Sequence, residues 1–477
     1  MRVSSSQIFN AGVRTINSQM ASLLHVQQQV ASGRRILTPS DDPVAAARAL
    51  EVTQSESVVT QFQLNHNNAS SALGLEEAQL SSASDLIARV RELTVQAGNT
   101  LLSNSDRRAL SFEMRARFDE LVGIANATDG AGLHVFSGFM GTTKPFDGTV
   151  DFLNASLGNE ITYQGDEGQR RLQVSTTRFL EISDSGTAVF TQIKQGNGTF
   201  TSSYGPTFNS TNGLWDQVNS GTGIIDGGVV ISPATWADPA TPKNYVINFG
   251  IDNTVVPPVT YYDIVDNDPV SPTRGNSLLT GAPSIFGVPD ALASDGSTVL
   301  AGAIAPPSSP IPAPTVASGL NVYRSGQPIS IPNAGANVLI TGDPAQNDSF
   351  TLNASGSQSI FKTMANVIKA LETATTENPA ATAKLANDVG FALTNLDQGT
   401  ENILRVRAAI GTRLKEVDSL GSVLEDLKLQ FQQTLSQLQD LDYAKAITDL
   451  TRKQTDLQAA QQSFVRISEL SLFNYLR

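Results

Sequence analysis

Apolar residues recur every seven positions along the first 30 residues, with a second apolar position between most of them. The stripe that they form consists of Phe9, Val13, Ile16, Met20, Leu23 and Val30. So narrow a stripe is typical of a coiled-coil seam and not of a broad core face. Ser32-Gly33 follows, and glycine at this point favours the end of a helix. The pattern predicts one long helix that packs on a partner.

Three further helical runs follow the same kind of pattern. The first extends from Val44 to about Gly98, and a shorter one lies within 105–125. Helix returns near Gln358 and continues to the end, but its heptad register breaks near Asp440–Asp442. Beyond the break we expect a second apolar stripe that packs against the first. It consists of Leu450, Leu457, Phe464, Ile467, Leu470 and Phe473. The two stripes stand at opposite ends of the chain, and their similar length predicts that they pair.

The middle of the chain has the opposite character. The sequence contains 22 prolines, and all but Pro39, Pro43, Pro145 and Pro379 lie between Pro206 and Pro344. Proline inside a helix costs about 3 kcal/mol, so this region is not expected to be helical. Short apolar runs such as GVVIS, NYVINF and NVLIT, separated by turn residues, predict strands.

Between the helices and this middle, two stretches have the composition of turns and strands. Residues 128–146 contain four glycines, and ITYQGDEGQRRLQVS alternates about a Gly-Asp-Glu-Gly turn, which predicts a β-hairpin. The predicted fold is mainly α with β, discontinuous and layered. Its expected parts are a terminal helical domain (1–40 and 440–477), a helical body with a β-hairpin (41–180 and 351–439) and an inserted all-β outer domain (181–350).

Charge and composition narrow the function. The net charge of −13 argues against nucleic acid as a partner, because phosphate binding needs clustered Lys and Arg. The absence of cysteine excludes thiol catalysis and Cys-ligated zinc. No run of eighteen apolar residues predicts a membrane span, and the start of the chain lacks the apolar region of a cleavable secretory signal. No membrane partner and no cofactor are expected.

Candidate chemical groups have simpler structural explanations. Asp41 and Asp42 precede Pro43, an arrangement that predicts a helix N-cap and not a metal or acid/base pair. The acidic run with Asp263, Asp266 and Asp268 is the best calcium candidate, but it lacks the EF-hand glycine and glutamate, so a solvated loop is favoured. His66 lies on the apolar stripe of its helix and is expected to form a polar layer. We expect no catalytic, metal-binding or cofactor-binding residues.

The two tryptophans leave one alternative open. Trp215 and Trp236 are the only tryptophans, and they mark either a carbohydrate-binding surface of the middle domain or its core. Core positions are the commoner use of tryptophan.

Four motifs resemble one family. QQQVASGRRILTPSDDPVAAARAL is similar to the N-terminal signature of the flagellin superfamily, and the Asp42-Pro43-Val44 form resembles its hook–filament junction branch. GLHVFSG (132–138), YQGDEGQ (163–169) and the tail LDYAKAITDLTRKQTDLQAAQQSFVRISELSLFNYL (441–476) resemble the same branch. The resemblance covers roughly 1–180 and 355–477.

This resemblance implies a structural, non-enzymatic role in the bacterial flagellum. It implies export by the flagellar type III apparatus, self-association in a ring, and contacts with other hook-associated proteins and flagellin. It also implies that a cytoplasmic export chaperone holds the C-terminal helix. The alternatives are a filament flagellin and a ligand-binding or enzymatic role of residues 181–350.

Overall fold

A computed structural model describes most of the chain. The described residues are 5–148, 161–209, 214–292, 299–307, 311, 313–315, 318–375 and 378–473. They divide into two compact units, to both of which the longest helices contribute. Unit 1 comprises residues 1–68, 173–179 and 416–477, and unit 2 comprises residues 69–172 and 180–415.

Six long helices carry the two ends of the chain. They are α1 (Ser5–Ser32), α2 (Pro43–Ala97), α3 (Asn104–Ala125), α5 (Ile360–Thr373), α6 (Pro379–Gln439) and α7 (Tyr443–Phe473). Helix α1 ends at the predicted Ser32-Gly33, where Gly33 has φ +70°, a backbone conformation that favours glycine. The break between α6 and α7 falls at the predicted register break.

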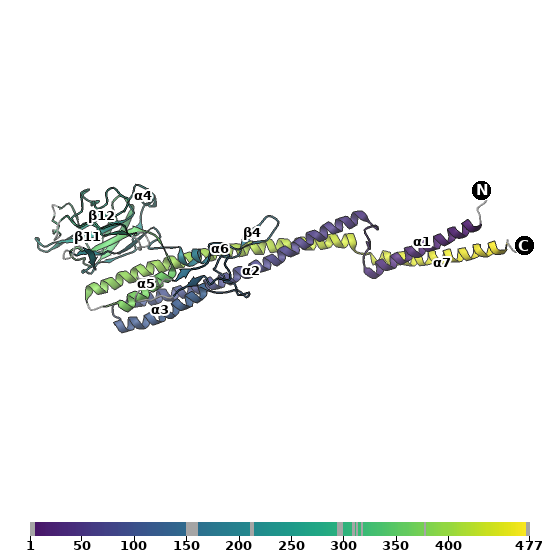
Figure 1. The fold of residues 1–477 in the computed structure, drawn as a ribbon, viewed down its shortest axis with the longest axis horizontal. Helices are drawn as coiled ribbons and strands as arrows, with labels where there is room; N and C mark the ends of the chain where they lie inside the picture. The colour runs from purple at the N-terminus through teal and green to yellow at the C-terminus, as the bar shows by residue number, and fades with distance from the viewer. Residues whose placement is uncertain are drawn as a thin grey trace. The chain divides into compact units, whose positions relative to one another are not determined.

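Unit 1 contains α1, α7, the first half of α2 and the last part of α6. Figure 1 shows α1 and α7 side by side, and the two helices are antiparallel because Phe9 near the start of α1 contacts Phe464 near the end of α7. Heptad residues of α2 and α6, among them Val59, Phe62 and Leu424, form a buried cluster. The predicted pairing of the terminal helices is confirmed.

The helical part of unit 2 is built on aromatic residues. Phe361 of α5 contacts Phe118 of α3, Phe146 and Phe190, with ring centroids 5.1 to 6.1 Å apart. Phe190 lies in a short π-helix (Thr187–Thr191), and Phe136 packs on it edge to face. Tilted and edge-to-face rings of this kind stabilise a core beyond the apolar area that they bury.

Short strands accompany this helical part. They are β1 (Phe146–Asp147), which pairs with β2 (Thr162–Tyr163), and β3 (Arg171–Gln173), which pairs with β4 (Phe179–Glu181). A hairpin in the helical body is therefore present, but the predicted pairing about Gly165–Gly168 is wrong. Asp166 there accepts hydrogen bonds from the amides of Phe139 and Gly168, and β2 pairs with the upstream strand β1.

The inserted β-rich region begins and ends at one two-stranded ladder, β5 (Ile193–Lys194) with β19 (Ser357–Gln358). Its main sheet has the order β15-β12-β11-β18-β6, and a second has the order β10-β17-β16 with β9 beside β17. Its other described elements are β6 (Phe200–Tyr204), β7 (Thr207–Asn209), β8 (Leu214–Gln217), β9 (Ile224–Ile225), β10 (Val229–Val230), the short helix α4 (Pro233–Ala237), β11 (Tyr245–Asp252), β12 (Val259–Asp266), β13 (Ala291–Leu292), β14 (Val299–Ala301), β15 (Asn321–Val322), β16 (Pro328–Ile331), β17 (Ala336–Thr341) and β18 (Ser349–Ala354). The strands predicted from GVVIS, NYVINF and NVLIT are confirmed as β10, β11 and β17.

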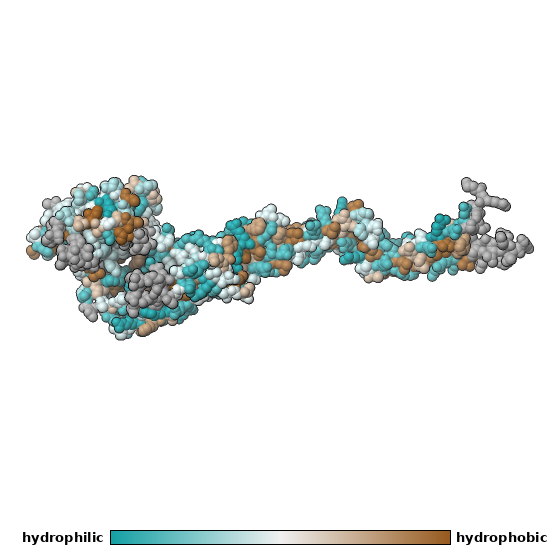
Figure 2. All heavy atoms as spheres, in the orientation of Figure 1, coloured by the Kyte–Doolittle hydropathy of each residue, from teal (hydrophilic) through white to brown (hydrophobic). Residues whose placement is uncertain are grey.

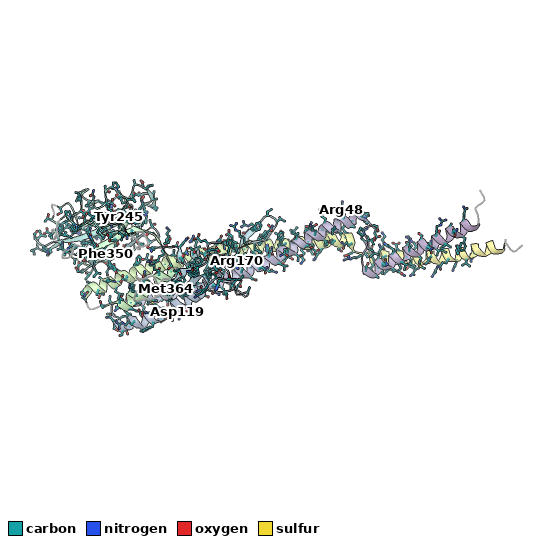
Figure 3. All side chains as sticks on the ribbon, in the orientation of Figure 1. Arg48, Asp119, Arg170, Tyr245, Phe350 and Met364 are labelled. Atoms are coloured by element: carbon teal, nitrogen blue, oxygen red, sulfur yellow. The ribbon has the colours of Figure 1, made fainter. Side chains whose placement is uncertain are left out.

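The core of this region lies between its two sheets. Tyr245 of β11 and Phe350 of β18, labelled in Figure 3, belong to one buried cluster together with Ile340 of β17. Trp236 lies in the same cluster, with its ring centroid 5.2 Å from that of Phe200. Trp236 is therefore a core residue, which was the favoured interpretation, and the alternative of a carbohydrate-binding surface does not hold for this position.

Candidate assembly surface

Helices α1 and α7 approach closely because one position has no side chain. A Cβ atom at Gly12 would lie 2.5 Å from the Phe464 ring, so glycine leaves the space that the ring occupies. The rings of Phe9 and Phe464 lie 5.1 Å apart. Leu23 of α1 and Leu457 of α7 are buried. The two predicted stripes thus meet in one intramolecular seam.

The seam buries only part of the predicted stripe. Val13, Ile16, Val30, Leu450 and Phe464 are half-buried, whereas Phe9 is 52% exposed and Met20 is also exposed. Ile467, Leu470 and Phe473 lie in α7, but their side chains are outside the described residues. Two helices cannot surround an apolar stripe on all sides, so apolar surface remains open to solvent.

Four further apolar residues on the same helix pair are exposed: Leu24, Tyr443, Ile447 and Val465. Tyr443 lies on the heptad register that continues to Leu450, with Ile447 beside it, whereas the stripes did not include Leu24 and Val465. Figure 2 shows apolar side chains at the surface along these paired helices. The sequence contains a weak signal for them, because Leu24 and Val465 directly follow stripe positions. Contiguous exposed apolar surface marks interaction sites in soluble proteins. We call the exposed and half-buried apolar residues of α1 and α7 the terminal surface.

The link between α1 and α2 is anchored to the link between α6 and α7. The Leu441 amide donates to Gly33 O at 3.0 Å, and the Arg35 amide donates to Gln439 O at 2.7 Å. The Arg35 guanidinium donates to Leu438 O at 2.8 Å and pairs with Asp42 at 3.3 Å. These contacts hold the beginning of α7 beside the end of α1.

Asp42 and Asp41 play different structural roles in this link. Asp42 accepts a hydrogen bond from the Ala45 amide at 3.0 Å and caps α2 ahead of Pro43, as predicted. Asp41 accepts hydrogen bonds from the amides of Thr38 and Leu37, and His25 Nε2 lies 3.1 Å away. The hydrogen bond from the Thr38 amide lowers the pKa of Asp41 to about 2. Partial desolvation opposes this shift, and the hydrogen bonds from Leu37 and His25 add to it.

A second apolar feature of unit 1 is a groove of about 480 Å³ where α2, α6 and the turn after β3 meet. Val58, Phe62, Val423, Leu427 and Phe431 line it, and Val58 and Val423 are exposed. His66 of α2 is buried, with Nδ1 3.1 Å from Val417 O and Nε2 3.0 Å from Val174 O. His66 is a polar layer, as predicted, and it joins α2 to α6 and to the turn.

The calcium candidate of the sequence has another role. Asp263 and Asp266 are fully buried, which makes the predicted solvated loop wrong. Asp263 accepts hydrogen bonds from Ser277 at 2.5 Å and Ser284 at 2.7 Å, and the Asp268 amide donates to Asp266 at 2.9 Å. Their oxygens stabilise loops that follow β12. Within the described ranges, no group of three or more His, Asp or Glu residues could hold a metal ion.

Known protein families match the two ends of the chain, where the sequence motifs lie. Residues 3–140 match the bacterial flagellin N-terminal helical region, and residues 393–476 match the bacterial flagellin C-terminal helical region. The chain is 32% identical over 193 residues to flagellar hook-associated protein 3 of Salmonella typhimurium. The alignment covers 40% of this chain and spans 58% of that relative's length.

Two solved structures from Legionella pneumophila share the fold. One is flagellar hook-associated protein 3, with 26% identity and a TM-score of 0.63 over 81% of this chain and 98% of the other. The second is the flagellar junction protein FlgL, with 25% identity and a TM-score of 0.62 over 82% and 100%. Among the described helices, none is long and apolar enough to cross a membrane. Both ends of the chain therefore match the helical regions of bacterial flagellin, one at each terminus.

Proposed function

We propose that the chain is an extracellular structural subunit of the bacterial flagellum that joins the hook to the filament. The observation that carries the proposal is the terminal surface, which two paired helices leave half exposed. The similarity to hook-associated protein 3 and to a flagellar junction protein supports this choice within the flagellin family. The flagellin family is structural, and we propose no enzymatic activity for this chain.

The proposed binding partners of the chain are proteins that could cover the terminal surface. Neighbouring copies in a ring, other hook-associated proteins and flagellin would each cover part of it with their own terminal helices. Burial of an apolar side chain contributes roughly 1.5–3 kcal/mol, so several such residues supply substantial free energy of assembly. The groove at Val58 and Val423 would receive further apolar side chains of a neighbour. An export chaperone would hold α7 and shield the same surface before secretion.

The three-part division of the chain belongs to this proposal. Residues 1–40 and 440–477 would form the inner assembly domain, residues 41–180 and 351–439 the body, and residues 181–350 an outer domain that assembly does not require.

Removal of residues 441–477 tests the proposal. The truncated chain loses one helix of the pair, so we expect complete hooks, no attached filaments, and flagellin released into the medium. Electron microscopy of the cells and immunoblotting of the medium measure these outcomes. Normal motility of the truncated strain would contradict the proposal.

A filament flagellin is the alternative. The chain is also 32% identical over 122 residues to a phase 1 flagellin of Salmonella naestved, but this covers only 24% of that relative. A filament protein polymerises into long fibres by itself. Fibres formed by the purified chain would favour this alternative over the junction proposal.

A further inference from the structure

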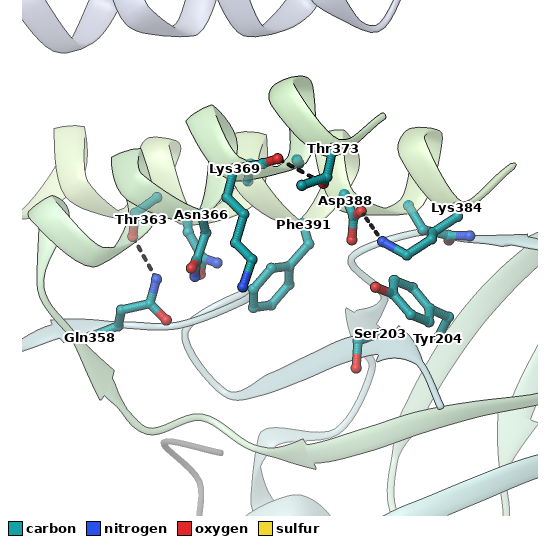
Figure 4. Close-up of a pocket in the computed structure, with 14 residues that line it drawn as sticks. Ser203, Tyr204, Gln358, Thr363, Asn366, Lys369, Thr373, Lys384, Asp388 and Phe391 are labelled. Carbon is teal, nitrogen blue, oxygen red and sulfur yellow. Dashed lines mark hydrogen bonds and ion pairs between the residues drawn. The ribbon is translucent and has the colours of Figure 1, made fainter. Parts of the chain in front are cut away.

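Unit 2 contains a pocket of about 400 Å³ where β6 faces α5 and the start of α6. Figure 4 shows Tyr204 and Phe391 in its lining, together with Lys369, Lys384 and Asp388. The volume is within the range of small-molecule sites. Polar residues make up most of the lining, and the aromatic rings of Tyr204 and Phe391 stand among them. The assembly proposal does not use this pocket.

The charged groups leave one positive charge available. Lys384 pairs with Asp388 at 2.7 Å, and its ammonium group lies 5.1 Å from the centroid of the Tyr204 ring. Lys369 extends into the pocket in Figure 4, and no described carboxylate lies within 4.0 Å of its ammonium group. Two ammonium groups and one carboxylate leave a charge of +1, in a chain whose net charge is −13. The pocket therefore favours an anionic ligand.

A buried amide in the lining also has a donor to spare. Asn395 is 3% exposed, and its Oδ1 accepts a hydrogen bond from the Gly196 amide at 2.8 Å. Its Nδ2 has no hydrogen-bond partner among the described residues. Neighbouring Asn387, by contrast, donates to Gly223 O and Ala383 O and accepts from the Ile225 amide. Buried donors are nearly always paired, so the Asn395 donor points to an external acceptor.

We propose that this pocket binds a monosaccharide that carries one carboxylate, of the uronic acid class. Lys369 binds the carboxylate, and Asn395 Nδ2 donates to a ring or hydroxyl oxygen. Tyr204 and Phe391 pack against the apolar C–H faces of the sugar ring. A simple inorganic or organic anion would use the lysine alone and would leave the aromatic walls without contact.

Calorimetric titration of the full chain tests this proposal with D-glucuronate as the probe. We expect saturable binding with a Kd on the order of 1 mM, and binding at least about tenfold weaker for D-glucose and for acetate. The Lys369→Gln variant should bind glucuronate about tenfold more weakly and glucose unchanged, because only the carboxylate loses its partner. Lys194→Gln, which removes one exposed ammonium group outside the pocket, is the matched control and should bind like the unaltered chain.

A second variant probes the amide. Asn395→Asp keeps an oxygen for the Gly196 amide but replaces the free donor with a carboxylate, so glucuronate binding should be abolished. If this variant fails to fold, the titration of Lys369→Gln, a substitution at a half-buried position, still tests the proposal. Three results would overturn the proposal. They are the absence of saturable glucuronate binding, acetate binding as tight as glucuronate binding, and equal affinities for glucuronate in the unaltered chain and the Lys369→Gln variant.

Discussion

Glu76 of α2 is a carboxyl group without access to solvent. Its Oε1 accepts a hydrogen bond from the Asp184 amide at 2.9 Å, whereas Oε2 has no partner among the described residues. Arg413 forms two hydrogen bonds with the Asp184 carboxylate, at 2.8 and 3.1 Å, and so is engaged there. Burial, reinforced by the charge of Asp184, raises the pKa of Glu76 to about 8. At neutral pH the group is therefore mostly protonated and uncharged in the folded chain.

This protonation makes stability depend on pH. Unfolded Glu76 loses its proton near its ordinary pKa of 4.5, whereas folded Glu76 keeps it up to about pH 8. The protonated Glu76 therefore contributes most to the free energy of unfolding below pH 4.5. This contribution is lost as the pH rises to about 8, by at most about 1.4 kcal/mol per pH unit. Glu76→Gln should remove this slope and raise the free energy of unfolding at pH 8.

Urea unfolding followed by circular dichroism between pH 5 and pH 9 measures the effect. Glu401→Gln, at an exposed position of α6, is the control and should leave the slope as it is. A pH slope equally steep in the Glu76→Gln variant and the unaltered chain would show that another group causes it.

At the scale of elements, the α1–α7 pair buries few apolar side chains completely. Phe464 fills the space above Gly12, and Leu457 is the only α7 residue of the predicted stripe that is buried among those described. A helix of about 30 residues with so narrow a seam is marginal by itself and is stabilised chiefly by packing. Changes in the seam should therefore separate the pair without unfolding the rest of the chain.

The double substitution Leu457→Asp and Phe464→Asp places two carboxylates in the seam. We expect a loss of several kcal/mol of pairing free energy, because a buried charge without a partner is strongly unfavourable. Faster amide hydrogen exchange in residues 5–32 would report the separation, and filament attachment in cells should fail. Gln458→Asp with Ser463→Asp adds the same charge at exposed positions of α7 and is the control. Unchanged exchange and normal attachment would mean that the seam is not required.

At the scale of the whole molecule, the β-rich region is joined through one ladder. Lys194 pairs with Ser357 and Ile193 with Gln358, so the chain leaves and returns at adjacent positions. Antiparallel strands in this register are joined readily by a two-residue Asn-Gly turn. The region between them can therefore be removed without stretching the chain.

Replacement of residues 195–356 by Asn-Gly should leave a folded helical protein. We expect retained helical circular dichroism, filament attachment in a complemented strain, and complete loss of glucuronate binding. Asn387 and Asn395 lose their partners but gain water, so the cost in stability should be moderate. Loss of filament attachment by a folded variant would show that the β-rich region takes part in the junction.

Local sequence patterns were sufficient to predict where the helices begin and end. The heptads, the glycine after Ser32, the Asp42-Pro43 cap and the break at Asp440–Asp442 act within one or two helical turns, so they could be read from neighbouring residues. The meeting of the two terminal stripes also followed, because a narrow apolar seam requires a partner and each stripe is the other's match. The resemblance of the terminal motifs to flagellins added the expectation of an assembly role, which periodicity alone does not supply.

Tertiary structure decided the rest, because the contacts join residues far apart in the chain. Strand β2 pairs with β1 across a long interval, and Asp263 is buried by loops that carry Ser277 and Ser284. Glu76 meets Asp184 only because α2 passes beside that loop, and the pocket of Lys369 requires β6 opposite two helices. The sequence by itself determined the helices, the strand-rich middle and the presence of a seam. Only the fold decided which polar groups are buried and which remain without a partner.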